Sequence, residues 1–267
     1  MTERSAVPPR RRRRPGLLAA TEPVRALASA GAFAAGLPLL QLAPRGEPHP
    51  VLVLPGLMAS DTSTRVLRIW LRRLGYPVVG WELGRNRGPT QEIVDALPRL
   101  LDRLAAEHGT AVSIVGQSLG GIYARTLARR VPRQVRQVIS LGSPFGSGNV
   151  DDTAAARVYR RYSSQHAPNA RTTQRRSTAR GSLAGPLPVP STAVYSRWDG
   201  VVDWRACRQE PGPRSENVAV HASHLGMGHD PAVLWVIADR LAQPRHEWQP
   251  FRRPTRFGLG ALFPPEG

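Results

Sequence analysis

The sequence contains one cysteine and no lysine among its 267 residues. A single cysteine, Cys207, cannot form an intramolecular disulfide, so we expect the fold to be independent of an oxidising compartment. No motif places a base beside Cys207, which favours a passive thiol over a nucleophile. No set of histidine, cysteine and acidic residues has the spacing of metal ligands, and we therefore expect neither a metal nor another cofactor.

The sequence also lacks an unbroken hydrophobic segment long enough to span a bilayer. Residues 16–42 are rich in alanine and leucine and follow the basic run Arg10–Arg14, an arrangement that resembles a secretory signal. However, Glu22, Pro23 and Arg25 interrupt the apolar stretch, and no clear small-residue cleavage site precedes the first predicted strand. Export and membrane spanning are therefore not the preferred interpretation.

The N-terminal region is instead predicted to consist of two parts. We expect a basic, disordered tail over residues 1–20, then an N-terminal helix over residues 21–48 that packs on the core, with Thr21 as its N-cap. This arrangement predicts a cytoplasmic protein, and peripheral membrane contact through the basic N-terminus is the alternative.

Positive charge dominates the composition. All 37 basic residues are arginine, against 19 acidic residues, which gives a formal net charge of +18. Such a charge is typical of proteins that bind nucleic acid or anionic membranes. However, residues 1–50, 147–189 and 244–267 together hold 19 of the arginines and only 7 of the acidic residues. Because no recognition motif accompanies the charge, we expect no nucleic-acid partner.

From residue 49 onward, short apolar runs alternate with amphipathic helical segments. This alternation predicts an α/β fold, with a mostly parallel central sheet flanked by helices, in one domain over residues 49–243. The expected strands are residues 51–54, 76–81, 111–116, 134–141, 191–196 and 217–220. The expected helices are residues 62–74, 91–107, 119–130 and 231–241.

The alternation stops over residues 147–190, where Ala, Arg, Ser, Thr and Gln predominate. A long insertion of this kind inside a compact domain is usually functional or disordered, and we expect a lid or cap here. Residues 244–267 follow the domain as a C-terminal extension.

The segment Gly116–Gly121, with the sequence GQSLGG, matches the pattern G-x-S-x-G. It follows a predicted strand and precedes a predicted helix, as this motif requires. A serine on so tight a turn adopts a strained backbone conformation, and its neighbours must be small for the turn to close. The turn raises the hydroxyl above the sheet, beside a helix N-terminus that stabilises negative charge. We therefore expect Ser118 to be a nucleophile.

A serine hydroxyl needs a histidine base, which in turn needs a carboxylate that orients it. With a nucleophile on this kind of turn, the chain order is serine, acid, histidine. Asp199 lies in the loop after the predicted strand 191–196, and the glycine that follows it permits a turn that aims the carboxylate inward. Asp203 is the alternative, although its position resembles the start of the next element.

Three histidines follow in the required order. His224 lies in the loop before the helix that begins at Pro231, where the base is expected, and it is preferred. His221 directly follows the strand 217–220 and can simply end it, whereas His229 belongs to a cluster at the helix start. Both remain alternatives to His224.

The negative oxygen of a tetrahedral intermediate needs two backbone N–H donors. One is expected from Leu119, the residue after the nucleophile. The other is expected from the loop after the first strand, where Gly56 lets the chain bend. In that loop Leu57 is the preferred donor and Met58 is the next.

Substrate-binding residues are expected at the same edge of the sheet. Met58 and Trp81 could line an apolar acyl pocket, and Asn86 lies in a loop that could meet a polar substrate group. Core packing and a solvated loop are the alternative interpretations. The partner expected at Met58, Trp81 and Asn86 is a small-molecule ester or acyl substrate.

With these motifs the chain resembles the α/β-hydrolase superfamily, in particular lipase-like and esterase-like members with reduced N-terminal strands. The matching stretches are residues 51–56, 80–86, 116–121, 141–145, 195–203 and 223–226. The resemblance implies a Ser118–Asp199–His224 triad that cleaves carboxylic esters through an acyl-serine intermediate. A hydrolase-fold acyltransferase or thioesterase is one alternative. A non-catalytic hydrolase-fold protein with a basic surface for anionic lipid or nucleic acid is the other.

Two features depart from the family pattern. Pro55-Gly56 stands where His-Gly is often found at the oxyanion loop, and the expected lid has little apolar character. The second departure argues against a long-chain lipid substrate.

Overall fold

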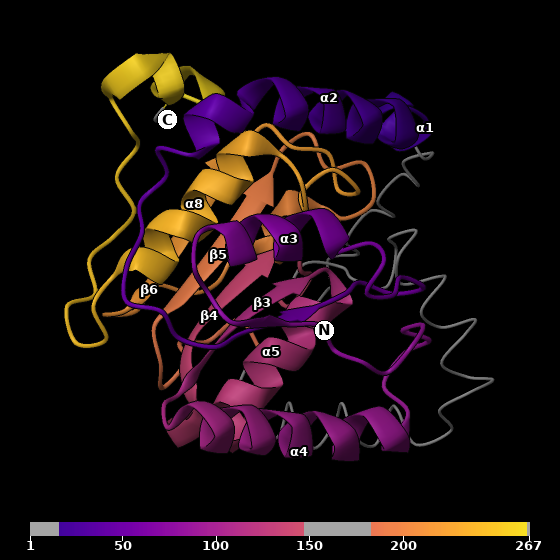
Figure 1. Ribbon diagram of the computed structural model, residues 1–267. Helices are drawn as coiled ribbons and strands as arrows, with labels where there is room; N and C mark the ends of the chain where they lie inside the picture. The colour runs from indigo at the N-terminus through magenta and orange to yellow at the C-terminus, as the bar shows by residue number, and fades with distance from the viewer. Residues whose placement is uncertain (1–15, 147–182, 266–267) are drawn as a thin grey trace, which may run out of the picture.

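The computed structural model describes residues 16–146 and 183–265 (Figure 1). Its strands are β1 (Val51–Leu54), β2 (Val78–Val79), β3 (Val112–Gln117), β4 (Val135–Leu141), β5 (Ser191–Ser196) and β6 (Ser215–Val220). Its α-helices are α1 (Leu17–Ala20), α2 (Glu22–Leu40), α3 (Arg65–Arg73), α4 (Gln91–His108), α5 (Leu119–Arg130) and α8 (Pro231–Ala242). Its 3-10 helices are η1 (Pro132–Gln134), η3 (Trp204–Cys207) and η4 (Arg256–Leu262). Most of the expected tail and most of the expected lid lie outside the described residues.

The six strands form one parallel sheet in the order β2-β1-β3-β4-β5-β6. The predicted α/β fold is therefore confirmed. From β1 the chain first adds β2 on one side, and then returns to place β3 on the other side of β1. In open parallel sheets, a crevice forms outside the carboxyl ends of the strands at such a reversal. The residues that follow β1 and β3 lie at this position.

Helices cover both faces of the sheet. Helices α4 and α5 lie on one face, α3 and α8 on the other, and α2 runs outside α8 (Figure 1). Strand β1 shows how the sequence produces this arrangement, because successive side chains of a strand point to opposite faces. Val51 and Val53 belong to the core on the α3/α8 face, whereas Leu52 and Leu54 belong to the core on the α4/α5 face. Each fully buried aliphatic side chain contributes roughly 1.5–3 kcal/mol.

Strand β2 is shorter than the predicted strand 76–81. The carboxylate of Asp61 accepts hydrogen bonds from the backbone N–H groups of Trp81 and Glu82, at 3.1 and 3.0 Å. These two donors are therefore satisfied by a side chain and not by a neighbouring strand. The contact joins residues far apart in sequence, so strand periodicity did not reveal it.

The final parts of the expected N-terminal tail and of the expected lid lie within the described residues. The final part of the expected disordered tail forms helix α1, where the Thr21 hydroxyl donates to the carbonyl oxygen of Leu17. The final part of the expected lid, residues 183–190, packs on the domain, because the buried Arg125 donates to the carbonyl oxygens of Leu183 and Gly185. Backbone acceptors on these segments thus have partners that local composition did not indicate.

Helix α2 has few buried residues. Only 6% of an 18-residue window within this 19-residue helix is buried. The mean hydropathy of 1.3 means that length and composition alone would allow the helix to cross a membrane. Signal sequences and the core helices of other proteins share those properties. In the structure α2 crosses over the N-terminal end of α8, where Gly36 faces Pro231 (Figure 1).

Candidate active site

Ser118 lies at the turn between β3 and α5, with φ 51° and ψ −118°. Positive φ is uncommon for a residue with a side chain and stores strain that the surrounding structure must maintain. The glycine two residues later allows this turn to approach β1 closely. A Cβ atom at Gly120 would lie 2.4 Å from the carbonyl oxygen of Leu54. The GQSLGG motif therefore forms the sharp strand-to-helix turn that its sequence predicts.

Asp199 and His224 form a buried pair at the same edge of the sheet. Asp199 lies in the loop after β5, residues 197–203 (the acid loop), and His224 in the loop after β6, residues 221–230 (the base loop). The His224 Nδ1 atom is 2.7 Å from Asp199 Oδ2. The other carboxylate oxygen, Oδ1, accepts the backbone N–H groups of Val201 and Val202 at 2.9 and 2.7 Å. Asp199 is thus held by its own loop while it contacts the imidazole.

The alternatives to these two residues lie elsewhere. Asp203 is exposed and caps η3 by accepting the backbone N–H of Arg205 at 3.0 Å. His221 is exposed, and His229 Nε2 is 2.8 Å from the carbonyl oxygen of Ala26 on α2. The structure therefore brings Asp199, and not Asp203, to a histidine, and that histidine is His224.

The environment of His224 affects its basicity. Burial lowers the pKa of His224, but the charge of Asp199, its hydrogen bond and the charge of Glu22 raise it, and the net pKa lies above the ordinary value of 6.5. A hydrogen bond from Nδ1–H to Asp199 leaves the Nε2 lone pair free to accept a proton. This tautomer suits a general base.

Ser118 and the Asp199–His224 pair come from separate loops that contact each other. The Gln117 side chain donates to the His224 carbonyl oxygen at 3.0 Å and so joins the serine turn to the base loop. At the end of β4, a Cβ on Gly142 would lie 3.1 Å from His224 Nδ1, so only glycine leaves room for the imidazole. In the described chain no hydrogen bond joins the Ser118 hydroxyl to His224. Catalytic hydrogen bonds are often long without substrate and shorten when it binds.

The loop after β1 lies directly beside Ser118. A Cβ at Gly56 would be 3.2 Å from the Ser118 Cβ. The Met58 N–H donates to the Asn86 carbonyl oxygen at 2.6 Å, and Met58 is held at φ 62°. Within the described residues the Leu57 N–H donates to no other group of the chain, so it is available to a ligand. Leu119 is the first residue of α5, where helix geometry provides no internal acceptor for an N–H group.

Comparisons with known proteins address the fold. No protein-family model and no curated protein matches the sequence. Lipase B of Aspergillus fumigatus aligns with a TM-score of 0.59 at 17% identity, over 85% of this chain but only 62% of the lipase chain. One of the metagenome-derived lipolytic enzymes LipS and LipT aligns with a TM-score of 0.52 at 16% identity, over 74% of this chain and 93% of its own. A monoacylglycerol lipase of Paleococcus ferrophilus aligns with a TM-score of 0.51 at 13% identity, over 74% of this chain and 97% of its own.

The chain has the α/β-hydrolase fold. At these identities the likeness establishes the architecture alone, and the chemistry depends on the residues of this chain.

Two of the predicted substrate-binding residues are inaccessible to solvent in the structure. Trp81 and Asn86 both have an exposed fraction of 0%. Trp81 packs in the α4/α5 core and donates from Nε1 to the Gly84 carbonyl oxygen at 2.9 Å. Asn86 donates from its side chain to the Pro55 carbonyl oxygen at 3.0 Å and so fastens the loop after β1. Of the three predicted residues, only Met58 is partly exposed.

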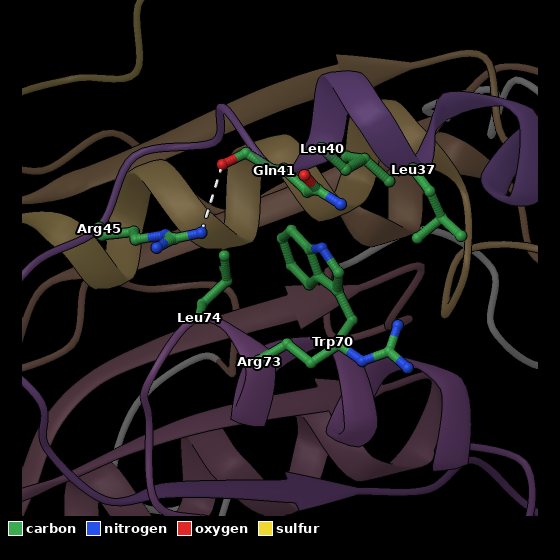
Figure 2. A pocket seen from close by; sticks show the side chains of 7 residues that line it. All are labelled: Leu37, Leu40, Gln41, Arg45, Trp70, Arg73 and Leu74. Atoms are coloured by element: carbon green, nitrogen blue, oxygen red, sulfur yellow. Dashed lines mark hydrogen bonds between the residues drawn. The ribbon is translucent and has the colours of Figure 1, made fainter.

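A pocket of about 200 Å³ lies away from this site (Figure 2). Its lining residues are Leu37, Leu40, Gln41, Arg45, Trp70, Arg73 and Leu74. It lies between the C-terminal end of α2 and α3, with the Trp70 ring directed toward α2. The start of α2 lies at the site, because Glu22 accepts the backbone N–H of His224. Leu37 is roughly 20 Å further along this helix, at 1.5 Å per residue. This pocket is therefore not the acyl pocket expected beside Ser118.

Two residues that contact the site, Gln117 and Glu22, are not recognisable as such from local sequence patterns. Gln117 was considered only as part of the serine motif, although its side chain contacts the base loop. In the sequence, Glu22 stands out as an interruption of an apolar segment at a predicted helix start, yet in the structure it is buried and contacts both the acid loop and the base loop. A charged residue within an apolar helix was the available signal, but its partners lie far away in sequence. Among the residues described, no group of three or more His, Cys, Asp or Glu could hold a metal ion.

Proposed function

We propose that the chain is a serine hydrolase that cleaves carboxylic esters through an acyl-Ser118 intermediate. The observation that carries the proposal is the buried Asp199–His224 hydrogen bond at the edge where Ser118 sits on a strained turn. Activated serine nucleophiles require a base that is itself oriented by a third group. A histidine with a purely structural role would not require a buried carboxylate partner next to a serine on a strained turn.

The proposed reaction begins when Ser118 Oγ attacks the ester carbonyl carbon and His224 Nε2 accepts the hydroxyl proton. The carbonyl oxygen becomes negative and is stabilised by the N–H groups of Leu57 and Leu119. When the tetrahedral intermediate collapses, the C–O bond of the ester breaks, and the imidazolium gives its proton to the leaving alkoxide oxygen. An alcohol leaves and the acyl group remains on Ser118.

Deacylation repeats these steps with water as the nucleophile. His224 accepts a proton from water, the oxygen attacks the acyl carbon, and Ser118 Oγ leaves and regains the proton from His224. The carboxylic acid is released and the enzyme returns to its initial state. Asp199 stays ionised throughout, keeps His224 in the required tautomer and stabilises the imidazolium. If an alcohol took the place of water, the same intermediate would serve an acyltransferase. If a thioester took the place of the ester, it would serve a thioesterase.

The test is labelling with a fluorophosphonate probe, followed by turnover of p-nitrophenyl esters of increasing chain length. We expect Ser118→Ala to abolish labelling and to lower kcat by at least about 10³-fold, because the covalent step is lost. The exposed Ser63 supplies a matched control, and Ser63→Ala should label as the wild type does. Circular dichroism checks that each variant is folded.

Two outcomes would contradict the proposal. Labelling that persists in Ser118→Ala would place the reactive group elsewhere. A folded wild-type protein that is neither labelled nor active would favour the non-catalytic alternative, in which the basic surface binds anionic lipid or nucleic acid.

A further inference from the structure

The Glu22 carboxylate lies between the two loops that carry Asp199 and His224. Its Oε1 atom accepts the backbone N–H of Gly200 at 2.7 Å and that of His224 at 3.1 Å. Its Oε2 atom accepts the N–H of Leu225 at 3.1 Å. One side chain of helix α2 therefore connects the acid loop with the base loop, 178 and 202 residues further along the chain.

We propose that Glu22 is a positioning residue, through which helix α2 holds the acid and base loops in the arrangement that the Asp199–His224 pair requires. This inference rests on the proposed function of Ser118 and the pair. It assigns α2 to the catalytic end of the domain, although most of the helix is exposed.

The Glu22 side chain is buried and fully engaged with other parts of the chain, unlike a simple helix cap. Its exposed fraction is 3%. Burial raises the pKa of Glu22, but the three backbone N–H groups and Arg25, 2.9 Å away, lower it more, so the net pKa lies below the ordinary value and the group is ionised at neutral pH. Burying a carboxylate is unfavourable unless its acceptor sites are filled. The two loops supply those donors only when both are in place.

Other contacts fasten the same end of α2 to the two loops. Arg25 donates from Nη1 to the Trp198 carbonyl oxygen in the acid loop. A Cβ atom on Gly200 would lie 2.4 Å from the Leu18 carbonyl oxygen, so the acid loop packs closely against the segment that leads into α2. In Figure 1 the N-terminal half of α2 lies over the loops drawn in orange. Glu22 is thus held rigidly while it contacts both loops.

The charge of Glu22 also acts on His224, whose pKa is lowered by burial and raised by Asp199 and Glu22. Among the described residues, the other titratable or charged groups on or against the base loop include Arg25, which pairs with Glu22, the exposed His221, and His229 and Asp230 before α8. Replacing Glu22 with the neutral glutamine removes one negative charge, so the pKa of His224 falls. Because only the neutral imidazole can accept the serine proton, the acid limb of the rate profile moves to lower pH.

The experiment compares the rate of fluorophosphonate labelling across pH in the wild type and in Glu22→Gln. We expect the maximal rate to fall about 10- to 100-fold, the size of effect that a misplacement of roughly 1 Å produces. We also expect the acid limb to shift to lower pH. The control is Glu92→Gln, which makes the same change at an exposed carboxylate in the first turn of α4 and should keep the wild-type rate and limb.

The outcomes separate the two proposals. A labelled wild type and a Glu22→Gln variant with the same maximal rate and the same acid limb would overturn the role of Glu22 alone. Lower thermal stability without a shift of the limb would also overturn it, because a purely structural carboxylate would give that result. A wild type that is never labelled would overturn the proposed function itself.

If Glu22→Gln does not fold, Glu22→Asp provides the second test. Aspartate keeps the negative charge but is one methylene shorter, so it cannot reach both loops from α2. We expect the acid limb to stay near its wild-type position while the maximal rate falls. A Glu22→Asp variant that is labelled at the full wild-type rate would contradict the proposal.

Discussion

At the scale of single residues, the two oxygens of Asp199 have separate roles. Oδ1 accepts two backbone N–H groups of its own loop, and Oδ2 contacts His224. The backbone contacts restrict the carboxylate to one orientation, so the imidazole meets an acceptor that is already in place. Preorganisation of this kind is what lets a third residue orient a catalytic base.

This division of roles predicts the effect of replacing each candidate acid. Asp199→Asn should lower kcat by roughly 10³- to 10⁴-fold, because an amide cannot stabilise the imidazolium and favours the wrong tautomer. Asp203→Asn is the matched control and should stay within about twofold of the wild type, since its side chain is exposed. Steady-state kinetics on one p-nitrophenyl ester measures both. The opposite pattern would assign the acid role to Asp203.

The raised pKa of His224 predicts the pH dependence of the wild type. The imidazole must be neutral to act as a base, and its pKa lies above 6.5. Therefore kcat/KM should fall as pH decreases, with an acid limb whose midpoint is above pH 6.5. The pH profile of kcat/KM measures this midpoint in the free enzyme. A midpoint below 6.5 would show that burial outweighs Asp199 and Glu22.

At the scale of elements, the position of Ser118 depends on how closely α5 approaches β1. The backbone of Gly120 lies against the end of β1, where a side chain at this position would collide with the Leu54 and Pro55 carbonyl oxygens. The close approach also places the oxyanion loop beside Ser118. Packing between one helix and one strand therefore brings together Ser118 and the N–H groups that we propose as donors to the substrate oxygen.

This packing predicts that Gly120→Ala destabilises the protein by about 1–3 kcal/mol or more, the range for overpacked sites. Labelling of Ser118 should fall beyond the loss of folded protein, because α5 must move. Gly31→Ala in α2 is the control: nothing lies within 4 Å of its Cβ position, and the helix propensity of alanine should stabilise it by up to about 1 kcal/mol. Urea unfolding gives both values, and an unaffected Gly120→Ala would show that α5 has room to adjust.

At the scale of the whole molecule, the chain combines a high positive charge with exposed apolar side chains, some of which lie on the acid and base loops. The chain carries a net charge of +18. Exposed large apolar residues on α1 and α2 are Leu17, Val24, Leu27 and Leu39, and those on the acid and base loops are Trp198 and Leu225. Cationic and apolar groups together favour adsorption to anionic membrane surfaces.

We therefore predict that the protein binds vesicles containing phosphatidylglycerol, and that increasing salt weakens the binding because exposed charges are screened. Co-sedimentation at low and high ionic strength measures this. A chain that begins at residue 16 lacks the basic run of the N-terminus and should bind more weakly. Equal binding to neutral phosphatidylcholine vesicles would contradict the electrostatic part of this prediction. A cytoplasmic or membrane-peripheral location stays a prediction.

The sequence by itself determined the features that depend on local patterns. Strand and helix periodicity predicted the parallel α/β sheet, and GQSLGG predicted the turn at Ser118, because both arise from neighbouring residues and the backbone angles that they allow. The order serine, acid, histidine reduced the partners of Ser118 to two carboxylates and three histidines. Local pattern could go no further, since the competing residues lie within a few positions of each other.

Tertiary structure decided the rest. It brought Asp199 rather than Asp203 to His224, buried Trp81 and Asn86 where a substrate contact was expected, and placed Glu22 between the two loops. Each of these outcomes depends on how segments 25 to 202 residues apart pack against one another. Burial and hydrogen-bond partners are properties of that packing, and no local pattern in the sequence encodes which distant backbone N–H group will meet a given carboxylate.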